Sequence, residues 1–231
     1  MTIGRTIIIG DVHGCSGELQ TLIAQYADRG DRLFCTGDLV NRGPDPCGVL
    51  ELVRTHNITS VLGNHEDALL KWRDGWRARI KDYENETIAK LTRTDWDQIA
   101  ALPLYVDLSP DAVLVHAGVL PGRTVASTDR DILLRLRSFD AHGRVKYRST
   151  AGTTPWANLY GRDDGPFVVF GHSARTKVRR FDNAICIDTG CVYGGFLSAY
   201  ILEEDRVVQV RAEQCWYDPH THQPLRSSHS A

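Results

Sequence analysis

Short, mostly apolar runs that each stop at a glycine recur along the N-terminal part of the chain. They lie at residues 6–9, 32–36 and 58–62. Bounded runs of this kind, rich in β-branched residues, are typical of buried strands. Apolar residues at helical spacing occur within residues 16–27 and 49–53, and these segments are predicted to be helices. Three successive strand–loop–helix units predict βαβ connections and a parallel core sheet.

The pattern changes between Ala68 and Leu102. Trp72, Trp76 and Trp96 are scattered there among charged residues, with no strand-like alternation. We expect two or three helices that form a small cap, at about residues 68–102, over the ends of the strands. An equally good interpretation is that these tryptophans form only the core of a small helical subdomain.

Strand-like runs resume after this helical segment. They occupy residues 104–108, 112–115, 167–170 and 184–187, and a hairpin is predicted from 196–202 and 207–210. One helix is expected at 131–136, whereas 141–164 shows little periodicity and is expected to be a loop. The second half of the chain therefore favours consecutive antiparallel strands over further βαβ units.

The composition fits one globular domain. Of 231 residues, 42% are hydrophobic and 24% charged, which is ample for a sizeable core. We expect residues 1–217 to form this domain and the tail at 218–231, rich in Ser, Pro and His, to be disordered. A net charge of −2 gives no electrostatic reason to expect duplex nucleic acid or an anionic membrane as a partner. No apolar run approaches the roughly 20 residues that span a bilayer.

Cysteine usage and the N-terminal residues predict the compartment. The six cysteines show no CxxC spacing, so neither a disulfide scaffold nor a zinc–thiolate site is indicated. The first apolar run is too short for a signal peptide and leads directly into a polar motif. We therefore expect a cytoplasmic protein in a reducing environment.

Potential metal ligands follow one predicted strand after another. They are Asp11, His13, Asp38, Asn64, His65, His116 and His172. A lone histidine after a strand is more often a structural residue, but repetition at successive strand ends favours a metal centre. Carboxylate, imidazole and amide donors without thiolates suit hard divalent ions. We expect two ions, with manganese preferred and iron, zinc, cobalt or magnesium also compatible, and such pairs clamp the oxygens of a phosphoryl displacement.

Five sequence blocks in a fixed order carry a family resemblance. They are GDVHG at 10–14, GDLVNRG at 37–43, GNHE at 63–66, HAG at 116–118 and GH at 171–172. Together they resemble the signature of calcineurin-like metallophosphoesterases in the phosphoprotein phosphatase superfamily. DTGCVYGG at 188–195 makes the chain most similar to the ApaH-like diadenosine tetraphosphatase branch, with protein phosphatases of similar length close behind. The resemblance implies an α/β (α+β) fold of four layers, in which helices flank a central β-sandwich of mixed sheets.

The same resemblance implies roles for individual residues. Asp11 and His13 would hold the first metal, Asp38 would bridge both, and the second would be completed by Asn64, His116 and His172. A water activated by the two metals would attack phosphorus. His65 would be the general acid for the leaving oxygen, and Arg42 would hold phosphate oxygens, because a guanidinium matches them in pairs.

Three further expectations concern the rim of this site. Either Arg135 or Arg137 would supply a second phosphate-binding arginine, and Arg135 is preferred. Tyr193 is expected to line the substrate site, although core packing is equally plausible. Asp188 is expected to stabilise its own loop, or to orient a ligand histidine, rather than to bind metal.

One departure from the family pattern bears on the substrate. Asn41 stands where protein phosphatases of this superfamily usually have an aspartate paired with the catalytic histidine. A neutral amide gives less support to a charged imidazole than a carboxylate does. This favours symmetrical hydrolysis of dinucleoside tetraphosphates, such as diadenosine tetraphosphate to two ADP, because a nucleoside diphosphate leaves more readily than a serine alkoxide.

Two other functions remain open. One is a serine/threonine or dual-specificity protein phosphatase, whose partner would be a phosphoprotein instead of a small dinucleoside polyphosphate. The other is a metal-binding regulatory protein without turnover, which is disfavoured because every expected ligand, Arg42 and His65 are present.

Overall fold

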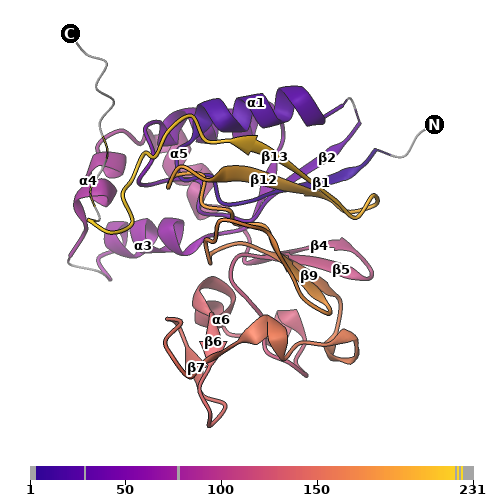
Figure 1. Ribbon diagram of the computed structural model, residues 1–231. Coiled ribbons are helices and arrows are strands. Elements are labelled where there is room, and N and C mark those ends of the chain that lie inside the picture. Colours follow the sequence, from indigo (N-terminus) through magenta and orange to yellow (C-terminus); the bar gives the residue numbers. More distant parts are fainter. Residues whose placement is uncertain (1–3, 29, 77–78, 222, 224, 226–231) are drawn as a thin grey trace.

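Two five-stranded mixed sheets stack face to face at the centre of the molecule (Figure 1). The computed structural model describes residues 4–28, 30–76, 79–221, 223 and 225. Sheet A has the order β13-β12-β1-β2-β3, formed by Arg206–Arg211, Phe196–Ile201, Thr6–Ile9, Arg32–Cys35 and Thr59–Ser60. Sheet B has the order β10-β11-β9-β5-β4, formed by Arg179–Arg180, Ala184–Cys186, Phe167–Phe170, Ala112–Val115 and Tyr105–Ser109.

Apolar side chains fill both faces of each sheet. Ile8 of sheet A packs with Leu114 and Val169 of sheet B in the layer between the sheets. The outer face of sheet A is covered by α1 (Ser16–Tyr26) and α2 (Pro46–Thr55). The outer face of sheet B is covered by α6 (Arg130–Arg135) and by Trp156 in the short helix η2 (Trp156–Asn158). The predicted four-layer fold of helices around a mixed β-sandwich is confirmed.

Local sequence explains where the first two helices lie. Leu19 and Leu22 of α1 are buried against sheet A. Pro46 occupies the first turn of α2, where its missing N–H costs no hydrogen bond, and the Asp45 side chain caps the helix by accepting from the Gly48 N–H at 2.9 Å. The parallel pairs β1–β2 and β2–β3 make the expected βαβ units.

Three helices follow β3. They are α3 (Asn64–Arg73), α4 (Asp82–Ile88) and α5 (Arg93–Ala100), and α3 and α4 lie beside the ends of the two sheets (Figure 1). Ile99 is fully buried in the core of sheet A and Trp96 packs against it, whereas Trp76 is 85% exposed. The tryptophans of this segment therefore divide between core packing and the surface. No helix among the described residues is long and apolar enough to cross a membrane.

The second half of the chain differs from its sequence expectation in two ways. β9 pairs in parallel with both β5 and β11, so sheet B is not a run of consecutive antiparallel strands. The reason is the long segment between β5 and β9, which contains α6 and acts as a crossover. The expected loop at 141–164 contains β7 (Val145–Lys146) and β8 (Thr154–Pro155), which pair on either side of β6 (Ser138–Phe139).

The last two strands of the chain complete sheet A. The predicted hairpin of β12 and β13 is confirmed by their continuous antiparallel register. Of the tail expected to be disordered, residues 222, 224 and 226–231 lie outside the described part of the chain.

Candidate metal centre

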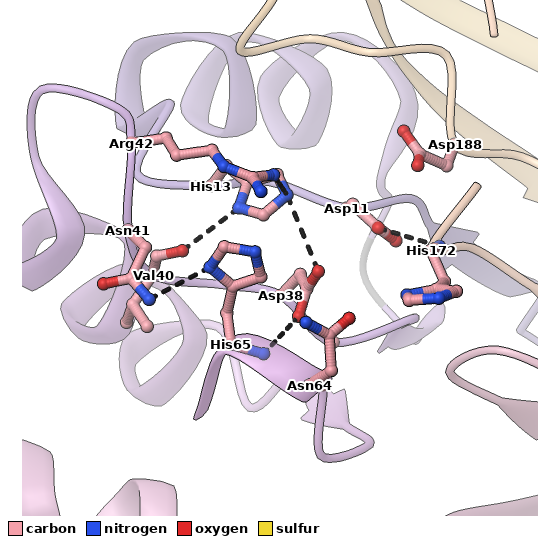
Figure 2. Close-up of polar contacts among 12 residues, drawn as sticks. Asp11, His13, Asp38, Val40, Asn41, Arg42, Asn64, His65, His172 and Asp188 are labelled. Carbon is pink, nitrogen blue, oxygen red and sulfur yellow. Dashed lines mark hydrogen bonds and ion pairs between the residues drawn. The ribbon is translucent and has the colours of Figure 1, made fainter. Parts of the chain in front are cut away.

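The predicted ligands meet where strands of both sheets end. Asp11 and His13 follow β1, Asp38 follows β2, Asn64 opens α3 after β3, His116 follows β5, and His172 follows β9. His13, Asp38 and His172 have backbone φ values of 49°, 49° and 65°. Such left-handed conformations are uncommon for residues with a side chain and cluster at functional sites. Figure 2 shows these side chains turned toward one another from separate loops.

Asp38 lies between the histidines of the two predicted metal positions. Its Oδ2 is 3.6 Å from His13 Nε2, and its Oδ1 is 3.6 Å from His116 Nε2. Asn64 Oδ1 is 3.1 Å from the same nitrogen of His116. Potential donors of Asp38, His116 and His172 all lie within 4.8 Å of one another, as do those of His13, Asp38 and His65. Asp38 is therefore the one carboxylate shared by both groups of donors.

Backbone carbonyls set the orientation of two of these histidines. His13 Nδ1 is 3.1 Å from the Val40 carbonyl oxygen, and His116 Nδ1 is 2.7 Å from that of Thr36. A carbonyl oxygen only accepts, so each Nδ1 carries the proton and each Nε2 presents a lone pair to the centre. Burial lowers the pKa of His13 to about 4, which keeps that imidazole neutral, as a ligand must be.

Asp11 is a buried carboxylate beside the donors grouped around Asp38. Asp11 Oδ1 accepts from the Thr36 hydroxyl at 2.6 Å, and its Oδ2 accepts from the His172 N–H at 2.8 Å. Burial raises the pKa of Asp11 well above its usual range, and the carboxylates of Asp188 and Asp38 raise it further. Bound divalent cations would offset the unfavourable burial of these negative charges, so the chemistry of the donor set fits the predicted pair of metals.

Asp188 lies near Asp11 but has a different contact (Figure 2). Its Oδ1 accepts from the Gly190 N–H at 3.1 Å, within its own loop. Burial raises the pKa of this carboxyl group as well. The contact with Gly190 agrees with the expectation that Asp188 stabilises its loop.

Arg137, rather than Arg135, contacts a predicted metal ligand. Arg137 Nε donates to His172 Nε2 at 3.2 Å, and Nη2 donates to the His172 carbonyl oxygen at 3.0 Å. Arg135 forms an ion pair with the buried carboxylate of Asp67, and Arg130 forms a second ion pair with the same carboxylate. Both arginines lie between the last two ligand histidines in the sequence, where the resemblance implies a phosphate-binding arginine, and Arg135 is the one preferred there. The helix α6 directs Arg135 to Asp67, so a role for it at the phosphate stays a prediction.

His65 stands beside the ligands and is held by Asn41. Asn41 Nδ2 lies 3.0 Å from His65 Nδ1 (Figure 2), and the ring of His65 stacks on Tyr83 with centroids 5.7 Å apart. Burial lowers the pKa of His65 well below its usual value, and the charge of Arg42 adds to this effect. The imidazole is therefore neutral near pH 7.

Arg42 lies in a cage of tyrosines. Its Nη1 donates to the Tyr193 hydroxyl at 2.6 Å and lies 3.4 Å from His13 Nε2. The guanidinium carbon is 5.5 Å from the ring centroid of Tyr83, 5.7 Å from that of Tyr193 and 5.6 Å from that of Tyr217. These cation–π contacts fix a side chain that would otherwise be mobile. Of these three tyrosines the sequence indicates only Tyr193 for the substrate site, because Tyr83 and Tyr217 do not lie near a strand end of the recognised motifs.

Two hollows meet at this centre. The larger has a volume of about 570 Å³ and is lined by residues that include Asp38, Arg137 and His172. A second, of about 490 Å³, extends toward Trp76 and Tyr147. The two share Arg42, Asn64 and His65 in their linings, so a long ligand could occupy both and cross the centre.

The arrangement has counterparts among known proteins. Residues 4–184 match the family model described as calcineurin-like phosphoesterase. The chain belongs to the calcineurin-like phosphoesterase family. A solved structure described as a putative diadenosine tetraphosphatase superposes on this phosphoesterase with a TM-score of 0.81 and 30% identity, covering 91% of this chain and 95% of its own.

Relatives of known name belong to the same branch of this family. The symmetrical bis(5'-nucleosyl)-tetraphosphatase of Bordetella pertussis is 29% identical over 94% of the phosphoesterase and 98% of its own length. The asymmetrical bis(5'-nucleosyl)-tetraphosphatase of Halalkalibacterium halodurans is 30% identical, with coverage of 90% and 94%. The predicted membership of the ApaH-like diadenosine tetraphosphatase branch is confirmed, and with it a metal-dependent phosphohydrolase.

Proposed function

We propose that this phosphoesterase hydrolyses dinucleoside tetraphosphates symmetrically, releasing two nucleoside diphosphates. The observation that carries the proposal is the pair of hollows that meet at Arg42, Asn64 and His65. A substrate cleaved at its middle needs room for a nucleoside arm on each side of the reacting phosphorus. The names of the relatives support dinucleoside polyphosphates as the substrate class.

In this proposal six residues hold the metals and the rest of the site handles the substrate. The ligands are Asp11, His13, Asp38, Asn64, His116 and His172. Two bound divalent ions would supply an acidified water and electrostatic stabilisation of an in-line displacement at phosphorus. Manganese is the ion we propose, in a cytoplasmic enzyme.

The chain's own groups would bind and neutralise the polyphosphate. Arg42, held within its tyrosine cage, would contact oxygens of the reacting phosphate without first losing side-chain freedom. Arg137 lines the larger hollow beside His172 and would contact a neighbouring phosphate from the other side. Tyr193 would keep Arg42 in place through its hydroxyl.

The state of His65 supports a polyphosphate over a phosphoserine substrate. With a lowered pKa and a neutral partner in Asn41, this histidine is a poor source of a full proton. Its Nε2–H can still donate a hydrogen bond to a leaving phosphate oxygen. A nucleoside diphosphate needs little more than this, whereas a serine alkoxide needs protonation.

Product analysis tests the proposal. Purified protein with Mn²⁺ should convert diadenosine tetraphosphate to ADP alone, and a mixture of AMP and ATP would indicate asymmetrical cleavage instead. Rates on a phosphoserine peptide, measured side by side, should be far lower. A faster rate on the peptide would favour the protein-phosphatase alternative.

A further inference from the structure

Two exposed aromatic side chains border the hollow beside His65. The exposed large hydrophobic residues of the described chain include two aromatic ones, Trp76 at 85% and Tyr147 at 45% exposure. Both line the 490 Å³ hollow that contains His65 and Arg42. Exposed aromatic rings gathered at one concave site mark a ligand surface more often than rings scattered singly do.

The backbone of Trp76 is fixed although its ring is exposed. The Trp76 N–H donates to the Lys71 carbonyl oxygen at 2.8 Å, and the Gly75 N–H donates to that of Trp72 at 3.1 Å. Gly75 has φ +78°, so the end of α3 is a Schellman motif. An apolar residue at the position of Trp76 normally packs back onto its own helix. Here the helix end instead holds the indole at the edge of the hollow.

A lysine in the same hollow contacts the tyrosine that stacks on His65. Lys81 Nζ is 3.0 Å from the Tyr83 hydroxyl and 5.4 Å from the centroid of the Tyr83 ring, which stacks on His65. Lys81 lines the same hollow as Trp76. Lys71 and Arg135 also line it, but both form ion pairs with the buried Asp67. Lys81 is therefore the cation best placed to meet a phosphate that enters along this hollow.

We propose that Trp76 and Tyr147 form a stacking platform for one nucleobase of the substrate, with Lys81 contacting the phosphate chain between that base and His65. The inference rests on the proposed function and names the part of the protein that selects a nucleotide. Aromatic stacking accepts any base, because every base has a π-face. The platform therefore selects nucleotides over phosphopeptides without choosing adenine over guanine.

Kinetics on two substrates test the platform. Trp76→Ala should lower kcat/KM for diadenosine tetraphosphate about tenfold more than for p-nitrophenyl phosphate, which lacks a nucleoside. The loss should lie in KM rather than kcat, and Trp76→Phe should recover most of it. Leu159→Ala, which removes another exposed apolar side chain away from the hollow, is the matched surface control and should change neither substrate. Equal losses on both substrates, or none, would overturn the platform.

A binding measurement separates this inference from the proposed function. Calorimetric titration with ADP and with inorganic pyrophosphate needs no turnover. Trp76→Ala should weaken ADP binding about tenfold more than pyrophosphate binding. If the wild-type protein does not cleave diadenosine tetraphosphate, the proposed function fails, yet the ratio for ADP and pyrophosphate still decides the platform. An unchanged ratio would reject it.

Discussion

The side-chain amide of Asn41 lies against the imidazole of His65, with Nδ2 3.0 Å from Nδ1. An amide nitrogen only donates, so Nδ1 accepts and the single ring proton of the neutral imidazole is on Nε2. Asn41 thus fixes the tautomer of His65 without supplying the negative charge that would favour the imidazolium. The chemistry available to His65 is therefore set by a neutral neighbour.

Replacing Asn41 with aspartate should change the preference among leaving groups. A carboxylate beside Nδ1 favours the charged imidazole and so a stronger general acid. We expect Asn41→Asp to raise the ratio of kcat/KM for a phosphoserine peptide over diadenosine tetraphosphate by about tenfold, a fraction of the roughly 100- to 10,000-fold that a general acid contributes. Asn41→Ala, which removes the amide without adding charge, should not raise this ratio. An unchanged ratio in Asn41→Asp would mean that His65 does not protonate the leaving oxygen.

Removing the charge of Asp38 should abolish turnover. Asp38 is the only carboxylate that faces both His13 and His116 among the donor groups described, at 3.6 Å from each. Asp38→Asn should reduce kcat by more than about 100-fold, because even partners of a ligand can cost that much. Metal analysis of the purified variant should show fewer than two ions per chain. Near-normal activity would remove Asp38 as the shared ligand.

The metal-free protein should lose stability as the pH rises above about 7. Burial raises the pKa of Glu66 to about 8, and the Asp38 carboxylate contributes, while backbone N–H groups act in the opposite direction. Burial also raises the pKa of Asp11. Because these pKa values lie above those of the unfolded chain, their stabilising contribution is complete below about pH 4 and disappears as the pH rises toward 8.

Thermal melting after chelation measures this effect. Burial lowers the pKa of His13 and His65, so these histidines add stability as the pH rises to their unfolded value of about 6.5 and change little above it. Between pH 7 and 8 the carboxyl groups therefore decide the sign, and the Tm of the chelated protein should fall by a few degrees. Added Mn²⁺ should reduce the fall, since cations offset the charge of the buried carboxylates, and should restore activity. A Tm of the chelated protein that stays level or rises over this interval would contradict the argument.

Replacing Arg135, the last residue of α6, and replacing Arg137, two residues later, should have different effects on activity and stability. Arg137→Ala removes a cation that lines the larger hollow and contacts His172, so kcat/KM should fall by about 10- to 100-fold. Arg135→Ala removes one of the cations that surround Asp67, so it should lower the Tm more clearly than it lowers kcat/KM. The reverse order of effects on kcat/KM would restore Arg135 as the phosphate-binding residue.

The sequence predicted the metal ligands better than the arginines and tyrosines around them. Ligands such as Asp11 and His116 directly follow strands whose apolar runs are visible in the sequence, so topology alone brings them together. Arg135 and Arg137 could not be separated in this way, because their difference depends on which one α6 turns toward Asp67. Tyr83 and Tyr217 come from segments with no motif, and they reach Arg42 only through tertiary packing.

The arrangement of sheet B was harder to predict for a related reason. β5, β9 and β11 are adjacent in space but separated by long segments, and a parallel neighbour cannot be distinguished from an antiparallel one by hydrophobic pattern alone. The strands β6, β7 and β8 have two residues each, so an alternation of apolar and polar residues cannot be recognised in them.

The division of the ligands between two sheets limits how this protein can vary. Asp11, His13, Asp38 and Asn64 come from sheet A, whereas His116 and His172 come from sheet B, so the centre is a seam across the sandwich. Sliding one sheet past the other by a single residue would separate Asp38 from His116. The packing of the apolar layer around Ile8 and Val169 therefore sets the relative position of the ligands from the two sheets. A change in the register between the two sheets would therefore remove the metal centre even if every ligand residue were retained.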